Sequence, residues 1–201
     1  MICIKLAVRK TIVIKTVCHF HNLVGSKAQY FCSMEIQNST LADIDTIFGL
    51  YRMAALYMKE RFWVHFPEFD RNMVIKEIEE GRQWKMMIDG ELACIWAITF
   101  NDPEIWEEKD ADPSIYIHRI TTVPAFRGRH LVKEIVNWAK IYAKEQGRKY
   151  VRLDTVGENQ KLIQHYQDSG FRFLGLVELK DTSTLPDHYK LDKVSLFELE
   201  V

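Results

Sequence analysis

The residues of this chain best suited to chemistry form a short basic turn between an apolar run and a helix. Residues 118–132 read HRITTVPAFRGRHLV, so Arg127, Gly128, Arg129 and His130 stand directly before an amphipathic stretch. The first N–H groups of a helix have no intrahelical partner, and with the helix dipole they form an anion site. Two arginines beside such a site favour a phosphate-bearing ligand. The turn therefore predicts a phosphate cradle, although taken alone it also fits a solvated helix start.

A second candidate pair lies further along the chain. Asn159 opens a short helix and Tyr166 follows seven residues later, so both side chains can occupy one helix face and meet one cleft. Asn159 suits either ligand binding or an N-cap. Tyr166 suits either a site or ordinary half-buried packing on a sheet.

Together these residues resemble the acyl-CoA-binding core of the GCN5-related N-acetyltransferase (GNAT) superfamily. Its signature is Arg or Gln, two residues, Gly, one residue, then Gly or Ala. In this chain it falls on Arg127–Val132, with His130 and Val132 in place of the two glycines. The flanking Val123-Pro124, Asn159, Tyr166 and Gly170-Phe171 match the family pattern. The resemblance is specific over the C-terminal half, and over residues 34–114 only the order of elements is compatible.

The resemblance implies an acetyl-CoA-dependent N-acetyltransferase that moves an acetyl group to a primary amine of a small molecule or peptide, directly within a ternary complex. Tyr166 would be the general acid that protonates the departing CoA thiolate. No cysteine lies where a covalent acyl-enzyme would be convincing. The alternative is a non-catalytic acyl-CoA-binding or regulatory module on the same fold, which the missing glycines favour. The expected cofactor-binding residues are Ile120, Thr121, Thr122, Val123, Arg127, Gly128, Arg129, His130, Leu131, Val132, Asn159 and Tyr166.

The general base is less defined by the sequence. His118 is the nearest titratable side chain on the expected central strand, and a histidine suits proton transfer near neutral pH. It is equally compatible with a packed core histidine, and the family sometimes needs only water. Simple strand alternation would place His118 with Ile120 and Thr122, on the face opposite Arg119. On the acceptor side, or alternatively in the core, we expect Met53, Tyr57, Phe62, Trp63 and Phe66.

The elements around these residues predict a mixed α/β fold. Helical periodicity indicates helices over 41–61, 70–80, 128–146 and 159–169. Asp89-Gly90 predicts a type I′ hairpin between strands 83–88 and 91–100, followed by a loop over 101–114. Further strands are expected at 115–123, 150–155, 171–179 and 189–199. This order predicts a GNAT-like fold with a central, mostly antiparallel sheet and about four helices.

Composition limits the alternatives. The 201 residues carry a net charge of -1, which does not support nucleic-acid binding, and no apolar run is long enough for a membrane span. Residues 1–33 contain basic but no acidic side chains. They fit a targeting leader, an upstream extension before Met34, or an extra strand near 11–17, and we expect one domain over 34–201.

Cysteine usage and spacing complete the expectations. Cys18, His19, His21 and Cys32 match no compact zinc pattern, so no metal is expected. Cysteines with no evident pairing are typical of a cytoplasmic enzyme. The terminal strands could pair in a homodimer.

Overall fold

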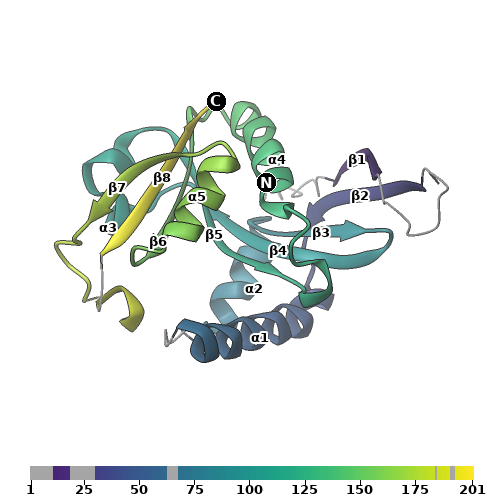
Figure 1. Ribbon diagram of the computed structural model, residues 1–201, viewed down its shortest axis with the longest axis horizontal. Coiled ribbons are helices and arrows are strands. Elements are labelled where there is room, and N and C mark those ends of the chain that lie inside the picture. Colours follow the sequence, from purple (N-terminus) through teal and green to yellow (C-terminus); the bar gives the residue numbers. More distant parts are fainter. Residues whose placement is uncertain (1–10, 19–29, 63–67, 184, 191–192) are drawn as a thin grey trace, which may run out of the picture.

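The computed structural model describes residues 11–18, 30–62, 68–183, 185–190 and 193–201 (Figure 1). The strands are β1 (Thr11–Cys18), β2 (Tyr30–Asn38), β3 (Gln83–Ile88), β4 (Glu91–Thr99), β5 (Ser114–Thr122), β6 (Tyr150–Val156), β7 (Arg172–Val177) and β8 (Val194–Glu200). The α-helices are α1 (Ile44–Phe62), α2 (Arg71–Glu79), α3 (Pro103–Trp106), α4 (Leu131–Glu145) and α5 (Gln160–Asp168). No helix within these ranges is long and apolar enough to cross a bilayer.

All eight described strands belong to one sheet, in the order β1-β2-β3-β4-β5-β6-β8-β7. Every neighbouring pair is antiparallel except β5 and β6, which run parallel. The predicted mixed, mostly antiparallel sheet flanked by helices is confirmed. The Asp89-Gly90 turn is confirmed as well, because both residues have positive φ (51° and 82°), as a type I′ turn requires.

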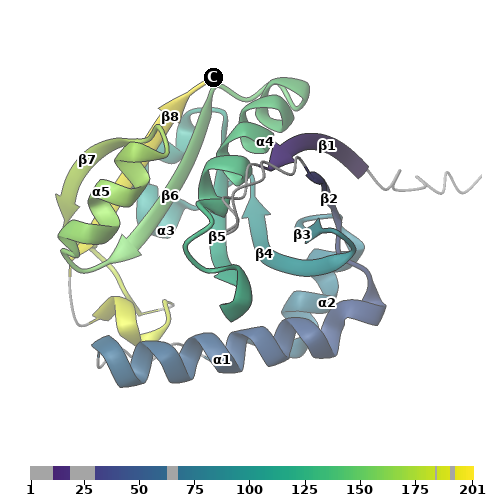
Figure 2. The ribbon, with the colours of Figure 1, turned by 45° about the vertical axis from the view of Figure 1, so that its right-hand side comes forward.

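Helices cover both faces of the sheet (Figures 1 and 2). α4 and α5 pack on one face, where Trp138 is fully buried between Trp84 and Trp96, with ring centroids 4.6 and 5.1 Å away. α1 and α2 pack on the other face, around Ile47 and Val74. α3 covers a third apolar cluster on β5 and β8. The predicted buried face of the 128–146 helix is confirmed, because Leu131, Ile135, Trp138, Ala139 and Tyr142 are all buried.

Three boundaries differ from the sequence-based expectation. The segment 101–114, expected as a loop, contains α3 and a 3-10 turn at Glu107–Ala111, because Pro103 suits the first position of a helix. The expected strand over 189–199 begins only at Val194, and Tyr189 lies in a 3-10 turn at Asp187–Lys190. α4 begins at Leu131 rather than at Gly128.

The extra N-terminal strand considered for residues 11–17 is present as β1. It pairs antiparallel with β2 from Thr11↔Gln37 to Cys18↔Tyr30. β2 begins at Tyr30 and runs without interruption through Met34, so part of the 1–33 segment belongs to the sheet.

Candidate functional site

The site is built around a fork between the two parallel strands. β5 and β6 are paired only at Ser114↔Tyr150, Ile115↔Val151 and Tyr116↔Arg152. Beyond Tyr116 the two strands separate, while β6 stays paired with β8 on its other side over its whole length. The edge of β5 from residue 117 onward therefore has no pairing with β6, and its N–H and C=O groups are available to an extended ligand.

A β-bulge re-aims the side chains of β5 inside this fork. His118 pairs with Ala97 and Thr121 with Ile95, so Arg119 and Ile120 together face the single residue between those partners. Arg119 has a φ of 54°, a left-handed conformation that costs a non-glycine residue about 1–2 kcal/mol. Its buried guanidinium forms an ion pair with Glu77, which connects the bulge to α2.

The bulge overturns the simple alternation expected for β5. Ile120 packs against the same core as Ile117, and Thr122 Oγ1 lies 3.6 Å from Cys94 Sγ in that core. His118 instead contacts Thr99 on the opposite face. His118 therefore does not share a face with Ile120 and Thr122, because the extra residue shifts the two-residue period by one.

The predicted phosphate cradle is an exposed turn at the start of α4. Arg127, Gly128, Arg129 and His130 are all exposed, and Leu131 is the first helical residue. Gly128 (φ 78°) and His130 (φ 56°) both adopt left-handed conformations. A glycine, which the family signature has at the position of His130, would adopt this conformation without strain. We expected His130 to belong to the helix, and it lies outside it. Its side chain makes no capping hydrogen bond.

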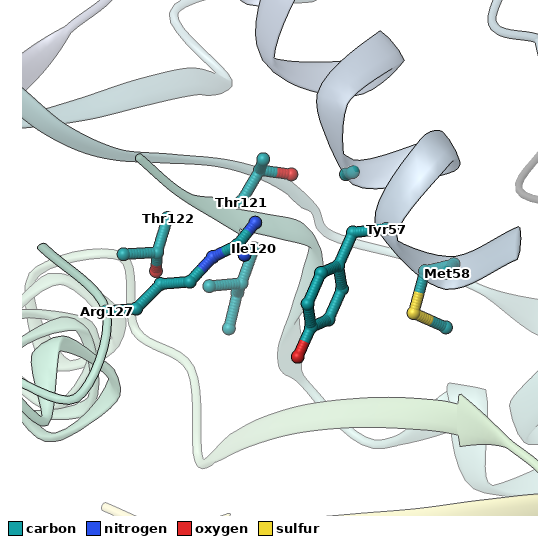
Figure 3. Close-up of a pocket in the computed structure, with 7 residues that line it drawn as sticks. Tyr57, Met58, Ile120, Thr121, Thr122 and Arg127 are labelled. Carbon is teal, nitrogen blue, oxygen red and sulfur yellow. The ribbon is translucent and has the colours of Figure 1, made fainter. Parts of the chain in front are cut away.

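A pocket of about 220 Å³ joins this turn to the fork (Figure 3). The Arg127 guanidinium lies 4.3 Å from the centre of the Tyr57 ring, a cation–π contact at the pocket rim. Four of the expected cofactor-binding residues, Ile120, Thr121, Thr122 and Arg127, line this single pocket, together with Ala54, Tyr57 and Met58 of α1.

Tyr166 lies deep beside the fork. Its ring is 9% exposed and packs on Phe197, 5.0 Å between centroids. Burial, with the nearby Asp154 and Cys94, raises the pKa of Tyr166 well above its usual range, so the phenol keeps its proton. Burial also raises the pKa of the Cys94 thiol to about 11. Asn159 acts as the N-cap of α5, where its Oδ1 accepts a hydrogen bond of 3.2 Å from the N–H of Leu162.

Three titratable side chains meet at the base of the fork. A ring nitrogen of His118, a carboxylate oxygen of Asp102 and one of Asp154 all lie within 4.8 Å of one another. His118 Nε2 is 3.8 Å from Asp102 Oδ2 and 3.2 Å from Thr99 Oγ1. The Tyr189 hydroxyl donates a 2.8 Å hydrogen bond to Asp154 Oδ2. We call Asp102, His118 and Asp154 the fork cluster.

Burial shifts all three pKa values toward the neutral forms. It lowers the pKa of His118 to about 3, assisted by Arg119 and Arg82. It raises the pKa of Asp102 to about 8, assisted by Asp154 and other nearby carboxyl groups. It raises the pKa of Asp154 to about 6. Perturbed groups converging in a cleft are typical of a functional site.

Sequence reasoning found His118 but missed both aspartates. Tyr116 of β5 and Arg152 of β6 are the last paired residues of the two strands. His118 lies two residues after Tyr116 and Asp154 two residues after Arg152, so His118 and Asp154 face each other across the fork. Asp102 arrives as the N-cap residue of α3, inside a segment expected to be a loop. An Asp directly before a Pro at a helix start was the one available signal for it.

The expected acceptor-side residues divide into three groups. Tyr57 lines the pocket, whereas Met53 is 42% exposed on α1. Trp63 and Phe66 lie outside the described residues, as does the side chain of Phe62. Of the group considered for metal binding, His19 and His21 lie outside the described residues, as do the side chains of Cys18 and Cys32.

Comparison with known proteins agrees with this geometry. The sequence model of the Acetyltransferase (GNAT) family matches residues 50–171, and the chain belongs to that family. It is therefore an acetyltransferase, and acetyl-CoA-dependent acetyl transfer is general to the family.

Individual relatives cover most of the chain. It is 26% identical over 164 residues to the uncharacterized N-acetyltransferase YesJ of Bacillus subtilis, covering 71% of this chain and 90% of that protein. A GNAT-family acetyltransferase structure from Listeria monocytogenes superposes with a TM-score of 0.67 at 25% identity, covering 84% of this chain and 95% of that one. The fold is also that of yncA from Salmonella typhimurium, solved with its cofactor acetyl-CoA (TM-score 0.59, 13% identity, 83% of this chain and 93% of that one).

Proposed function

We propose that this protein transfers the acetyl group of acetyl-CoA directly to a primary amine of a small molecule or peptide, within a ternary complex. The fork supports this proposal, because its unpaired strand edge lines a pocket that reaches Arg127 of the basic turn, and Tyr166 lies in the core against which Ile120 of that edge packs. The pantetheine arm would run along Ile120–Val123, and its pyrophosphate would bind the N–H groups at the start of α4.

Within this complex, Tyr166 protonates the departing CoA thiolate as general acid. His118 is the candidate base, directly or through water. Because its pKa is lowered to about 3, it can accept a proton only from the strongly acidic, positively charged nitrogen of the tetrahedral adduct. The buried Cys94 thiol supports direct transfer, because a thiol with a pKa of about 11 is a poor nucleophile at neutral pH. Proximity and orientation of the two bound substrates would supply much of the rate.

Thiol release from acetyl-CoA in the presence of a panel of amines tests this function. Tyr166→Phe is expected to lower kcat at least 100-fold while the Kd for CoA, measured by calorimetry, changes less than about twofold. Tyr150→Phe is the matched control, since it removes a hydroxyl from a half-buried tyrosine on β6 near the paired end of the fork. Equal loss in both variants would contradict the assigned role.

A second candidate, a non-catalytic acyl-CoA-binding or regulatory module, is favoured by one observation: His130 occupies a left-handed position of the cradle with an imidazole instead of glycine. It predicts CoA binding without thiol release for any amine tested. We also propose that the protein is cytoplasmic and that it forms a homodimer through its terminal strands. Sedimentation of the purified chain tests the dimer.

A further inference from the structure

At neutral pH Asp154 carries the negative charge of the fork cluster, whereas Asp102 keeps its proton until a cation binds beside it. Arg119 and Arg82, the cations that act on His118, are bound to acidic partners: Arg119 to Glu77, and Arg82 to Glu80 at 2.6 Å. Among the described residues, Asp102 Oδ2 is a buried oxygen with no hydrogen-bond partner. A buried polar oxygen without a partner costs free energy, and a cationic ligand would both bind this oxygen and favour the ionised form of Asp102.

The position of the cluster indicates which cation could reach it. His118 and Asp154 stand on the two arms of the fork, two residues beyond the last paired residues Tyr116 and Arg152. Asp154 directly follows Leu153, which is buried in the same core as Tyr166, so the cluster and the proposed general acid lie along the same stretch of β6. An amine that attacks the thioester near Tyr166 must therefore come close to these carboxyl groups.

We propose that Asp102 and Asp154 form a subsite for the ammonium group of the acceptor, and that this subsite selects amines without a neighbouring carboxylate. The inference rests on the proposed acetyl transfer, because it names the acceptor class of that same site. An alkylamine, a diamine or the amide of an amino acid would fit, whereas a free α-amino acid would bring its own carboxylate against two others.

The spacing of the cluster suits an ammonium group. A tetrahedral nitrogen with N–H···O contacts of about 2.9 Å separates its acceptors by up to about 4.7 Å. A tetrahedral metal ion with ligand distances of about 2.1 Å brings them to about 3.4 Å. His118 Nε2 and Asp102 Oδ2 are 3.8 Å apart, in a cluster whose ligand atoms lie within 4.8 Å of one another. This separation is wider than the spacing between two ligands of such a metal ion.

The proton balance follows from this arrangement. The bound ammonium gives one proton to a carboxylate of the pair, and the neutral amine attacks the thioester carbon. As the tetrahedral adduct collapses, the C–S bond breaks, the nitrogen gives its second proton to His118, and the thiolate takes the proton of Tyr166. The products are the N-acetyl amide and free CoA, and the protein exchanges its protons with solvent before the next turnover.

A matched pair of acceptors tests the subsite on the unmodified protein. Alaninamide and alanine differ in the carboxylate and, because of it, in the basicity of the amine, so kcat/KM is expressed per concentration of the neutral amine. We expect kcat/KM for alaninamide to exceed that for alanine at least 100-fold, with butylamine and 1,4-diaminobutane also accepted. Equal values for alanine and alaninamide would overturn the proposal.

Variants assign the selectivity to the two carboxyl groups. Asp154→Asn and Asp102→Asn should each lower kcat/KM for alaninamide at least 30-fold, leave the Kd for CoA within about twofold, and reduce the preference over alanine. Glu91→Gln, the same chemical change at an exposed residue of β4, should alter none of these. Full activity in both aspartate variants would refute the subsite.

A binding measurement separates the failure of this inference from failure of the proposed function. If no amine is acetylated, calorimetric titration of the CoA-bound protein with butylamine still reports on the subsite. Binding that Asp154→Asn abolishes supports the subsite even without turnover, and no detectable butylamine binding overturns it. Stoichiometric binding of Zn²⁺ or Mn²⁺ that both aspartate variants abolish would also overturn it, because the cluster would then be a metal site.

Discussion

Replacing Asp102 by asparagine should stabilise the protein, and the gain should grow with pH. The pKa of Asp102 is about 8 in the folded chain, against an ordinary value of 3.8. A raised carboxyl pKa means that the folded state holds its proton where the unfolded chain has released it, so stability is lost as the pH rises from about 4 to 8. One pKa unit corresponds to about 1.4 kcal/mol, which makes this loss about 4 kcal/mol at pH 7.

Asparagine removes the titration while keeping the shape of the side chain. The free energy of unfolding of Asp102→Asn should exceed that of the unmodified protein by about 0.5 kcal/mol at pH 4 and about 4 kcal/mol at pH 7. Urea unfolding followed by tryptophan fluorescence measures the difference, since the chain has five tryptophans. A gain that does not change with pH, or a loss that grows with it, would refute the reasoning.

Asp43 provides a control of opposite sign. Its carboxylate binds Lys85 Nζ at 2.8 Å and accepts hydrogen bonds from the N–H and hydroxyl of Thr40, and these partners hold its pKa below the ordinary value against the effect of burial. Its contribution is present above pH 4 and is lost as the pH falls through the folded pKa. Asp43→Asn should therefore destabilise the protein at pH 7, with a deficit that shrinks in acid.

Three further predictions concern the cradle and the core. His130→Val should lower the free energy of unfolding by about 1–2 kcal/mol, because a β-branched residue tolerates a left-handed conformation poorly, whereas His130→Gly should not lower it. The midpoints of urea unfolding measure both changes, and an equal loss in the two variants would contradict the strain at this position. Arg127→Ala should weaken CoA binding about tenfold or more and reduce its salt dependence, measured by calorimetry at two salt concentrations; an unchanged Kd would exclude Arg127 from the cradle. Trp138→Ala should cost about 3–5 kcal/mol of stability in urea unfolding, since it empties the centre of the main core; a loss below about 1 kcal/mol would contradict that packing.

The features that the sequence predicted correctly are those written in short-range patterns. The Asp89-Gly90 hairpin, the buried face of α4 and the strand–turn–helix around Arg127 depend on residues within a few positions of one another. Backbone preference and periodicity act over this range, so the order of elements and the family followed from the sequence alone.

The arrangement of the fork cluster depended on contacts between distant segments. At the bulge, Arg119 pairs with Glu77, 42 residues earlier, and the bulge puts His118 on the face opposite Ile120 and Thr122. Asp102 and Asp154 meet His118 only after α3 folds back and β6 leaves β5. Strand register and chain return are set by packing across the whole sheet. The sequence by itself therefore predicted the basic turn before α4, and tertiary structure alone decided which acids lie beside His118.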